Sequence, residues 1–504
     1  MFRLDPKQAV LDHVATQSLR NASGELSPLA AKIAARPVEP TYPPAVVTGV
    51  AQAVEALLLI TLGFTLYGIS GGDPLLHALT TLGVVAGAHV LINLAGMHRI
   101  GAYRTLLVQI WKTTAAWTGA CGLLAILVLL FDGAQVLSRA WMIAWWATGT
   151  LALAIYRFGL GALVRRWTAH GKLKRRTVIV GGGKDAEILI DAIRTGAADD
   201  INLFGLFDDR NDDRSPESVA SLPKLGRVSD LIEFARRTRV DLVIVSMPLS
   251  AETRVLDMLK QLWVLPVDIR LSAHMSKLRF TQKAYSYVGD VPVFDMADRP
   301  ISDWNLVFKW LFDKLVAIVA LVLLSPVMLA TAIAIKLESK GPVFFKQKRH
   351  GFNNQLIEMY KFRSMRTDMA DANAVKLVTK DDPRVTRVGK FIRKTSIDEL
   401  PQLFNVLKGE LSIVGPRPHA LQAKANNQLY YEAVEGYFAR HRVKPGMTGW
   451  AQIHGWRGET DTVEKIMQRV NHDLYYIENW SLWLDVKIVA LTPISLFTQH
   501  KNAF

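Results

Sequence analysis

Residues 391–418 read FIRKTSIDELPQLFNVLKGELSIVGPRP, and the rest of the chain is organised around this stretch. It places an acidic pair, Asp398 and Glu399, directly before apolar residues at helical spacing. These apolar positions follow the i, i+3, i+4, i+7 pattern of a short helix: Leu400, Leu403, Phe404 and Leu407. Arginines flank the pair, with Arg393 before it and Arg417 in a Pro-Arg-Pro turn after it. Carboxylates beside arginines indicate phosphate chemistry with a metal ion.

The acidic pair supports two interpretations from the residues alone. In the first, the helix N-terminus and the arginines keep a carboxylate ionised, so that it can attack phosphorus. Two adjacent acids also suit Mg²⁺, so one acid could be the nucleophile and its neighbour the metal ligand. In the second, Ser396 and Glu399 form a capping box, or Asp398 is an N-cap that leaves Pro401 at N3. The motif by itself leaves both interpretations open.

The composition indicates an integral membrane protein. The 504 residues are 50% hydrophobic and include long apolar runs. The net charge of +15 would suit nucleic acid, anionic lipid or a phosphate-bearing substrate, and the apolar runs favour the last two. We therefore expect inner-membrane lipids as partners and no nucleic acid. The single cysteine, Cys121, lies in an apolar run, which argues against a disulfide, a cysteine-based metal site and a catalytic thiol.

The N-terminal part predicts a tail followed by a membrane bundle. Residues 1–45 are polar and become proline-rich, which predicts a mobile cytoplasmic tail. Four apolar segments follow, at 46–69, 75–97, 106–131 and 140–164. Each is long enough to cross a hydrocarbon core of about 30 Å, so residues 46–167 predict four transmembrane helices. Lys and Arg gather in the tail, the second connection and the exit, which places both ends in the cytoplasm. Within the helices, Glu55 and His89 are interpreted as isolated structural residues.

Residues 168–300 predict a Rossmann-like α/β domain. The expected elements are a strand at 177–180, a helix at 186–193, and strands at 203–207, 240–246 and 267–271. Gly181, Gly183 and Ala186 match the fingerprint G-x-G-x-x-A, and Asp208 or Asp209 ends the second strand. Such turns are common in parallel sheets, and no Tyr-x-x-x-Lys pair is evident. We therefore favour a structural or regulatory module, and whether a nucleotide binds Gly181–Gly183 stays open.

The apolar run 311–335 is long enough to span a membrane, but its flanks argue against a crossing. Lys and Arg cluster after it, while the domain before it is already assigned to the cytoplasm. Ser325 and Pro326 lie in its middle, and an interior proline costs a helix about 3 kcal/mol and bends it. We predict a helix that enters from the cytoplasmic side, breaks at Ser325-Pro326 and returns. A plain fifth crossing is the alternative.

Three more stretches characterise the C-terminal region. Residues 361–366, KFRSMR, alternate cations with apolar residues, which predicts a half-buried strand with one charged face, or a solvated strand edge. Residues 444–452, KPGMTGWAQ, suit a tight loop that could hold a flat base or only turn the chain. Residues 473–497 are rich in aromatic side chains, which favours the membrane interface over a core helix.

Together these motifs resemble a known family. KFRSMR at 361–366, IRKTSIDELPQLFNVLKGELSIVGPRP at 392–418 and VKPGMTGWAQ at 443–452 are similar to stretches of the bacterial polyprenyl-phosphate hexose-1-phosphate transferases. Larger members of that family carry four transmembrane helices and a Rossmann-like domain. The resemblance implies an α-helical membrane bundle plus α/β domains, with a catalytic α/β domain at 301–504 that contains the re-entrant helix 311–335.

The resemblance also implies a reaction. A phosphoglycosyl transferase moves a sugar 1-phosphate from a UDP-sugar to undecaprenyl phosphate and releases UMP, which begins exopolysaccharide or related glycan synthesis. By resemblance, Asp398 is the nucleophile that forms a phosphosugar intermediate, and Glu399 helps to hold Mg²⁺. The family's basic strand and phosphate-binding arginines correspond to four residues: Lys361, Arg363, Arg393 and Arg417. The family's helix break corresponds to Ser325 and Pro326.

Substrate and location are expected on the same basis. The segment 454–462, HGWRGETDT, looks more like glucose-type members than galactose-type ones, so UDP-glucose is the expected donor. Because UDP-sugars are cytosolic and the lipid acceptor lies in the membrane, we expect a multi-pass protein of the bacterial inner membrane with a cytoplasmic active site. A homodimer is left open.

Two other function classes are weighed against this one. A membrane-anchored NAD-dependent sugar-nucleotide dehydratase or epimerase would need a second, complete dinucleotide fold with a catalytic tyrosine and lysine, which residues 300–504 do not offer. A non-enzymatic membrane scaffold would explain the basic charge and the apolar helices. It would not explain the paired acids between arginines.

Overall fold

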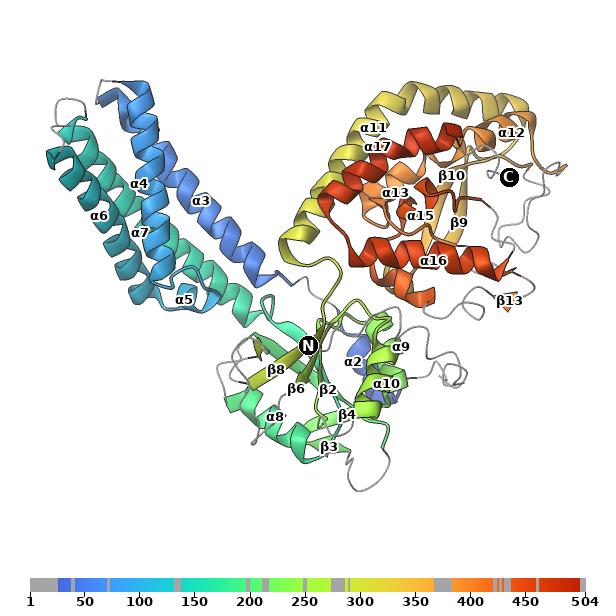
Figure 1. The fold of residues 1–504 in the computed structure, drawn as a ribbon, viewed down its shortest axis with the longest axis horizontal. Helices are drawn as coiled ribbons and strands as arrows, with labels where there is room; N and C mark the ends of the chain where they lie inside the picture. Colours follow the sequence, from blue (N-terminus) through green and yellow to red (C-terminus); the bar gives the residue numbers. More distant parts are fainter. Residues whose placement is uncertain are drawn as a thin grey trace. The chain divides into compact units, whose positions relative to one another are not determined.

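The computed structural model (Figure 1) describes residues 26–37, 41–69, 73–130, 137–195, 200–210, 217–247, 252–272, 286–288, 291–366, 383–419, 424–425, 428–429, 437–458 and 462–498. The chain forms two compact units. One is Glu39–Lys174, and the other is Met1–Val38 with Arg175–Phe504. Among the described residues, the first unit is entirely helical and the second contains every β-strand.

The helical unit is a bundle of four long helices. Its elements are α3 Pro44–Thr65, η2 Leu66–Ile69, α4 Pro74–Leu94, α5 Ile100–Arg104, α6 Leu106–Leu130 and α7 Arg139–Ala169. Helix α6 packs against α4 and α7, and α3 packs against the same two helices, which closes the bundle. The four predicted apolar segments are therefore confirmed as helices. With α11 of the other unit, the described residues contain five helices long and apolar enough to cross a membrane.

The bundle encloses a polar cluster, which makes the interpretation of Glu55 and His89 as isolated residues wrong. Arg157 Nη2 lies 2.6 Å from Glu55 Oε2, and Arg157 Nη1 donates to the carbonyl of Met97 at 3.0 Å. His98 Nε2 lies 3.5 Å from Glu55 Oε2, and ligand atoms of Glu55, His89 and His98 are all within 4.8 Å of one another. Sequence patterns missed the cluster because 102 residues separate Glu55 from Arg157. Since Arg157 neutralises Glu55, the cluster serves as a buried link between α3 and α7.

The second unit begins with an α/β domain. It contains α2 Pro28–Ala34, β1 Arg175–Val180, α8 Lys184–Thr195, β2 Ile201–Phe207, β3 Ser218–Val219, β4 Leu222–Gly226, α9 Val228–Arg237, β5 Leu242–Val245, α10 Glu252–Leu262, β6 Asp268–Ser272, β7 Ser286–Val288 and β8 Val291–Ala297. The sheet order is β3-β4-β2-β1-β5-β6-β8-β7. Strands β4, β2, β1, β5 and β6 pair in parallel, whereas β3, β8 and β7 are antiparallel additions. The predicted Rossmann-like domain is confirmed, with its first strand at the centre.

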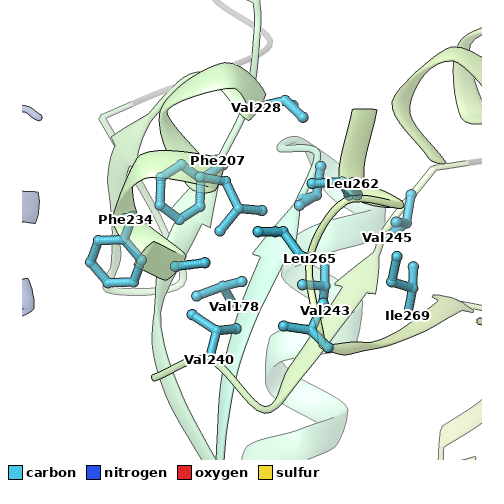
Figure 2. Close-up of a cluster of buried hydrophobic side chains, with 14 of the residues drawn as sticks. Val178, Phe207, Val228, Phe234, Val240, Val243, Val245, Leu262, Leu265 and Ile269 are labelled. Atoms are coloured by element: carbon cyan, nitrogen blue, oxygen red, sulfur yellow. The ribbon is translucent and has the colours of Figure 1, made fainter. Parts of the chain in front are cut away.

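The core of this domain explains why β5 and the end of β1 are apolar without interruption. Helices α9 and α10 cover one face of the sheet, where Val178, Val243 and Val245 lie in one buried cluster with Phe234 and Leu262 (Figure 2). Helix α8 covers the other face through a second cluster. Strands buried on both faces lack polar alternation. Strands β1 and β5 come closest to this condition, whereas β2 and β6 also carry half-buried residues. Strands β3, β4, β7 and β8 were not predicted.

Part of the predicted N-terminal tail belongs to this core. Residues Pro28–Ala34 form helix α2, which is capped by Ser27. Ala30, Ile33 and Ala34 are buried in the same cluster as the sheet, and Ser27 Oγ donates to the carbonyl of Leu225 at 2.6 Å. The prediction of a tail over residues 1–45 is therefore wrong for this helix. Residues 1–25 lie outside the described part of the chain.

The remaining residues form a second α/β domain. Its elements are α11 Asp303–Glu338, β9 Phe344–His350, η5 Phe352–Asn354, β10 Leu356–Phe362, α12 Arg387–Lys394, η7 Ile397–Glu399, α13 Gln402–Lys408, β11 Ser412–Val414, β12 Lys424–Ala425, β13 Gln428–Leu429, η8 Tyr437–Arg442, β14 Gly446–Thr448, α15 Trp450–Ile453, α16 Val463–Glu478 and α17 Leu482–Thr498. Strands β9 and β10 form an antiparallel hairpin, and β11 pairs in parallel with β14. The strand predicted at 361–366 is misplaced, because β10 begins at Leu356 and includes only the first two of these residues.

Helix α11 is one continuous helix through Pro326, so the predicted interruption at Ser325-Pro326 is absent. Its ribbon curves between its two halves (Figure 1). Ser325 Oγ donates to the carbonyl of Val322, one of the backbone groups that an interior proline leaves without its usual donor. An interior proline is a common cause of such curvature, and α11 continues through Pro326 without a break.

Candidate active site

The acidic pair lies in a short turn between two helices. Helix α12 ends at Lys394, and Ser396 then adopts the left-handed conformation with φ +59° and ψ +17°. Asp398 and Glu399 follow in the 3₁₀ turn η7, and Pro401 is the N-cap of α13. Pro401 is thus at the N-cap and not at N3 as the capping interpretation requires. The acidic pair therefore lies about one turn before α13, the helix that the apolar pattern predicted.

The structure contradicts the capping-box interpretation. Ser396 makes no side-chain cap hydrogen bond, and its hydroxyl accepts instead from Arg457 Nη2 at 2.6 Å. The Glu399 carboxylate accepts from Lys361 and Arg417. Both partners of the expected box therefore point their side chains toward cations from distant parts of the sequence. This geometry favours the phosphate-chemistry interpretation.

Glu399 is held by two cations. Arg417 Nη1 and Nη2 lie 3.1 Å from Oε2 and 2.5 Å from Oε1, a bidentate arrangement, and Lys361 Nζ lies 2.9 Å from Oε1. Burial by itself would raise the pKa of Glu399, but Arg417 and Lys361 outweigh it and hold that pKa well below its usual range. Glu399 is therefore ionised at neutral pH, and its three contacts fix its orientation.

Asp398 is different from its neighbour. Its side chain is 13% exposed, and Lys361 Nζ lies 3.8 Å from Oδ2, which is longer than the Glu399 contacts. Burial raises the pKa of Asp398, and the charge of Glu399 adds to this rise, while Lys361, Arg393 and Arg417 oppose it. The sequence predicted a carboxylate that the arginines keep ionised, and that holds for Glu399 better than for Asp398. Asp398 is the more basic of the two.

Arg417 is oriented by a buried network behind it. Arg440 Nη2 donates to the carbonyl of Arg417 at 2.7 Å and lies 2.5 Å from Asp473 Oδ2. The side chains of Arg440 and Asp473 are 0% and 2% exposed. The β11–β14 pairing brings Gly415 and Gly446 so close that a Cβ on Gly446 would lie 2.1 Å from the Gly415 nitrogen. The predicted loop at 444–452 therefore supports the turn that carries Arg417.

Two more cations act on the acidic pair. Arg393, in the last turn of α12, acts to lower the pKa of Asp398, and its phosphate-binding role stays a prediction. Arg457 is half-buried, and its pKa is lowered by burial and by Arg417, while Glu399 and Asp398 oppose this. The sequence interpretation named the segment that contains Arg457 but not the residue. Among the described residues, four cations (Lys361, Arg393, Arg417 and Arg457) thus act on the two acids, which leaves a local charge of about +2 when both acids are ionised.

Arg363, which the sequence predicted to bind phosphate, has its guanidinium engaged elsewhere. Its Nη1 donates to the carbonyl of Lys340 at 2.9 Å, and its Nη2 donates to the carbonyl of Ser339 at 2.8 Å. Arg363 follows directly after β10, so it leaves the strand that presents Lys361 and turns toward the C-terminus of α11. It satisfies carbonyls that the helix end leaves without partners.

The glycine turn of the first α/β domain is closed by its own side chains. Asp208 accepts from the Gly182 amide at 2.9 Å, and Arg210 Nη2 lies 3.0 Å from Asp208 and 2.8 Å from the Gly182 carbonyl. Burial would raise the pKa of Asp208, but Arg210 and the backbone donors hold it below its usual value. In a dinucleotide site this acid would bind a ribose hydroxyl. Its engagement here favours the structural module.

Comparison with known proteins matches the two domains separately. Residues 304–499 match the family described as bacterial sugar transferase, and residues 93–273 match one described as CoA-binding domain. The first match covers the domain that holds the acidic pair. The second covers most of the Rossmann-like domain.

Two relatives match most of this chain, and a third matches 39% of it. A Xanthomonas campestris pv. campestris protein named UDP-glucose:undecaprenyl-phosphate glucose-1-phosphate transferase is 36% identical over 410 residues, 81% of this chain and 84% of the relative. An Escherichia coli (strain K12) protein of the same name is 38% identical over 403 residues, 79% and 82% of the two chains. The exopolysaccharide production protein PSS of Rhizobium leguminosarum bv. phaseoli is 49% identical over 198 residues, 39% of this chain and 99% of the relative. The chain therefore belongs to the bacterial sugar transferase family.

Proposed function

We propose that this enzyme transfers glucose 1-phosphate from UDP-glucose to undecaprenyl phosphate, releases UMP and so begins exopolysaccharide synthesis. Its family makes it a transferase, which removes the scaffold and dehydratase hypotheses. The observation that carries the proposal is the contrast within the acidic pair: Arg417 and Lys361 fix Glu399 in the ionised form, while Asp398 is the more basic carboxylate. A carboxylate nucleophile beside a cluster of cations suits phosphoryl transfer.

The proposed reaction has two displacement steps at one phosphorus atom. An oxygen of Asp398 attacks the phosphorus of the sugar 1-phosphate, and the bond from that phosphorus to the UMP oxygen breaks. This forms a phosphosugar-aspartate and free UMP. An oxygen of undecaprenyl phosphate then attacks the same phosphorus and displaces Asp398. Lys361, Arg393 and Arg417 stabilise the negative charge that the diphosphate and the lipid phosphate bring together.

The acidic pair would hold Mg²⁺ together with phosphate oxygens of the substrate. Mg²⁺ usually takes one or two carboxylates and completes its octahedron with water and phosphate, which two adjacent acids fit. Both Glu399 oxygens already accept from cations, so Asp398 and the remaining lone pair of Glu399 Oε2 are the available ligand positions. When bound, the ion neutralises charge on the transferring phosphoryl group.

We further propose that α11 is re-entrant and holds the site at the cytoplasmic face of the inner membrane. Near its start, Lys309 Nζ donates to the carbonyl of Val414 at 3.0 Å, and at its end Glu338 accepts from the Arg387 amide at 2.7 Å. Both ends therefore bind the same domain. A straight helix of 36 residues would separate its ends by about 54 Å, which exceeds the hydrocarbon core. The curvature of α11, which contains Pro326, supports an entry and a return on one side.

The test is UMP release by detergent-purified protein with undecaprenyl phosphate and Mg²⁺, compared across UDP-glucose, UDP-galactose and UDP-N-acetylhexosamines. We expect lipid-dependent release with UDP-glucose, and none from Asp398→Asn under the same conditions. Lys346→Gln, which removes an exposed cation on β9, is the matched control and should behave as wild type. Equal release by Asp398→Asn would overturn the nucleophile, and release with another donor alone would overturn the sugar.

A further inference from the structure

The turn that carries the acidic pair contains a residue in an unfavourable conformation. Ser396 lies at C′ of helix α12, and its φ of +59° is in the left-handed region. Helices often end this way, but the residue is then usually glycine, because a Cβ makes the left-handed conformation costly. Glycine would fit the backbone without strain. We therefore expect the side chain of Ser396 to make an interaction that offsets the cost of this conformation.

This interaction is a hydrogen bond between Ser396 and Arg457. Arg457 Nη2 donates to Ser396 Oγ at 2.6 Å across 61 residues of sequence. Asp398 follows two residues after Ser396, and the Glu399 amide donates to the Ser396 carbonyl at 3.2 Å. The conformation of Ser396 therefore sets where the acidic pair begins. A contact that holds Ser396 also holds Asp398 and Glu399.

The loop that presents Arg457 is itself clamped. Arg469, on α16, donates from Nε to the carbonyl of Trp456 at 2.9 Å and from Nη2 to the carbonyl of Gly458 at 3.0 Å. These two carbonyls flank Arg457. Gly455 and Gly458 have φ of +89° and +110°, which glycine adopts readily and which let the loop fold tightly. The backbone on both sides of Arg457 is therefore held in place, which limits where its guanidinium can lie.

We propose that Arg457 is a positioning residue: by donating to Ser396 it holds the left-handed turn in the geometry that aims Asp398 at the donor phosphorus. The consequence for catalysis rests on the proposed function, in which Asp398 is the nucleophile. Without the contact, Ser396 relaxes toward ordinary backbone angles and the acidic pair loses its orientation. The left-handed penalty for a residue with a Cβ corresponds to about a tenfold change in the population of the turn.

A double-mutant cycle separates positioning from direct substrate binding. Arg457→Gln removes the charged donor, and Ser396→Gly allows the left-handed turn without help. Hydrogen exchange of the peptide that contains residues 395–400 is the first readout, because it needs no activity. We expect Arg457→Gln to speed exchange of the Ser396, Glu399 and Leu400 amides by about tenfold in the serine background and much less in the glycine background. Lys346→Gln should leave the exchange unchanged.

Kinetics supplies the second readout. With UDP-glucose, Arg457→Gln should lower kcat by about tenfold with little change in the donor KM, and adding Ser396→Gly should recover most of the loss. Equal exchange in wild type and Arg457→Gln would overturn the proposal. A raised donor KM without recovery by Ser396→Gly would also overturn it, because Arg457 would then bind the donor directly. Wild-type protein that releases no UMP contradicts the proposed function instead, while the exchange cycle still decides the role of Arg457.

Discussion

At the scale of residues, the two adjacent carboxylates of the site differ in their contacts and in their basicity. Glu399 is locked by a bidentate arginine and a lysine, whereas Asp398 is buried beside them with a longer contact to the same lysine. The sequence predicted the acids and three of their cations. It could not predict which acid each cation contacts, because Lys361 and Glu399 are 38 positions apart and are brought together only by the tertiary fold.

The first prediction concerns pH. Asp398 must be ionised to attack phosphorus, and burial raises its pKa, so activity should fall as the pH drops through a value above the ordinary aspartate pKa of about 3.9. Lys361 opposes this rise, so Lys361→Met should move the acidic limb of the kcat profile to higher pH. The position of the acidic limb is measured from UMP release at a series of pH values. An unmoved limb in Lys361→Met, or a shifted limb in Lys346→Gln, would contradict the assignment.

The second prediction concerns the buried pair behind Arg417. Asp473→Asn leaves the Arg440 guanidinium buried without its carboxylate, so we expect the free energy of unfolding to fall by about 3–5 kcal/mol. Glu233→Gln breaks a half-exposed pair with Arg237 and should cost less than about 1 kcal/mol. The free energies of unfolding of the two variants are compared by denaturant titration in detergent. Similar losses would mean that the buried pair has no special role.

At the scale of elements, periodicity predicted the regular pieces and missed the irregular ones. The apolar pattern correctly placed a helix after Glu399, but not the 3₁₀ turn that holds the pair itself. Arg363 looked like part of a charged strand because alternation in 361–366 continues past the end of β10. Where a strand stops depends on what its neighbour pairs with, and this is not encoded in local alternation.

The third prediction tests the curve of α11. Pro326→Ala restores an amide donor and removes the ring clash, so the helix should straighten and its two ends should no longer both fit the same domain. We expect UMP release to fall by about ten- to a hundredfold. Pro493→Ala, inside α17, is the matched control and should retain activity. Full activity of Pro326→Ala would show that the curve is dispensable.

At the scale of the whole molecule, domain order follows from the sequence because each part has its own composition. Long apolar runs predict the bundle, strand-helix alternation predicts the Rossmann-like domain, and both were confirmed. Two long-range features were missed: helix α2, which joins the core of a domain 140 positions later, and the Glu55–Arg157 pair. Neither lies in a local pattern that would reveal its partner.

The fourth prediction is the topology. In a Cys121→Ser background, single cysteines at Asp73, Ser302 and Lys346 place exposed probes before α4, before α11 and after α11. A membrane-impermeant maleimide should label Ser302→Cys and Lys346→Cys only in inside-out vesicles, and Asp73→Cys only in spheroplasts. Opposite accessibility of the two sites that flank α11 would establish a plain crossing.

The most direct test of the central claim is a search for the sugar-phosphate adduct on Asp398. Purified protein would be incubated with UDP-glucose and Mg²⁺ but no lipid, quenched in acid and analysed by intact-protein and peptide mass spectrometry. We predict one hexose phosphate per chain on the peptide that contains Asp398, with an equal amount of UMP, and no adduct in Asp398→Asn. Lipid-dependent UMP release without any adduct, or an adduct on another residue, would contradict the account.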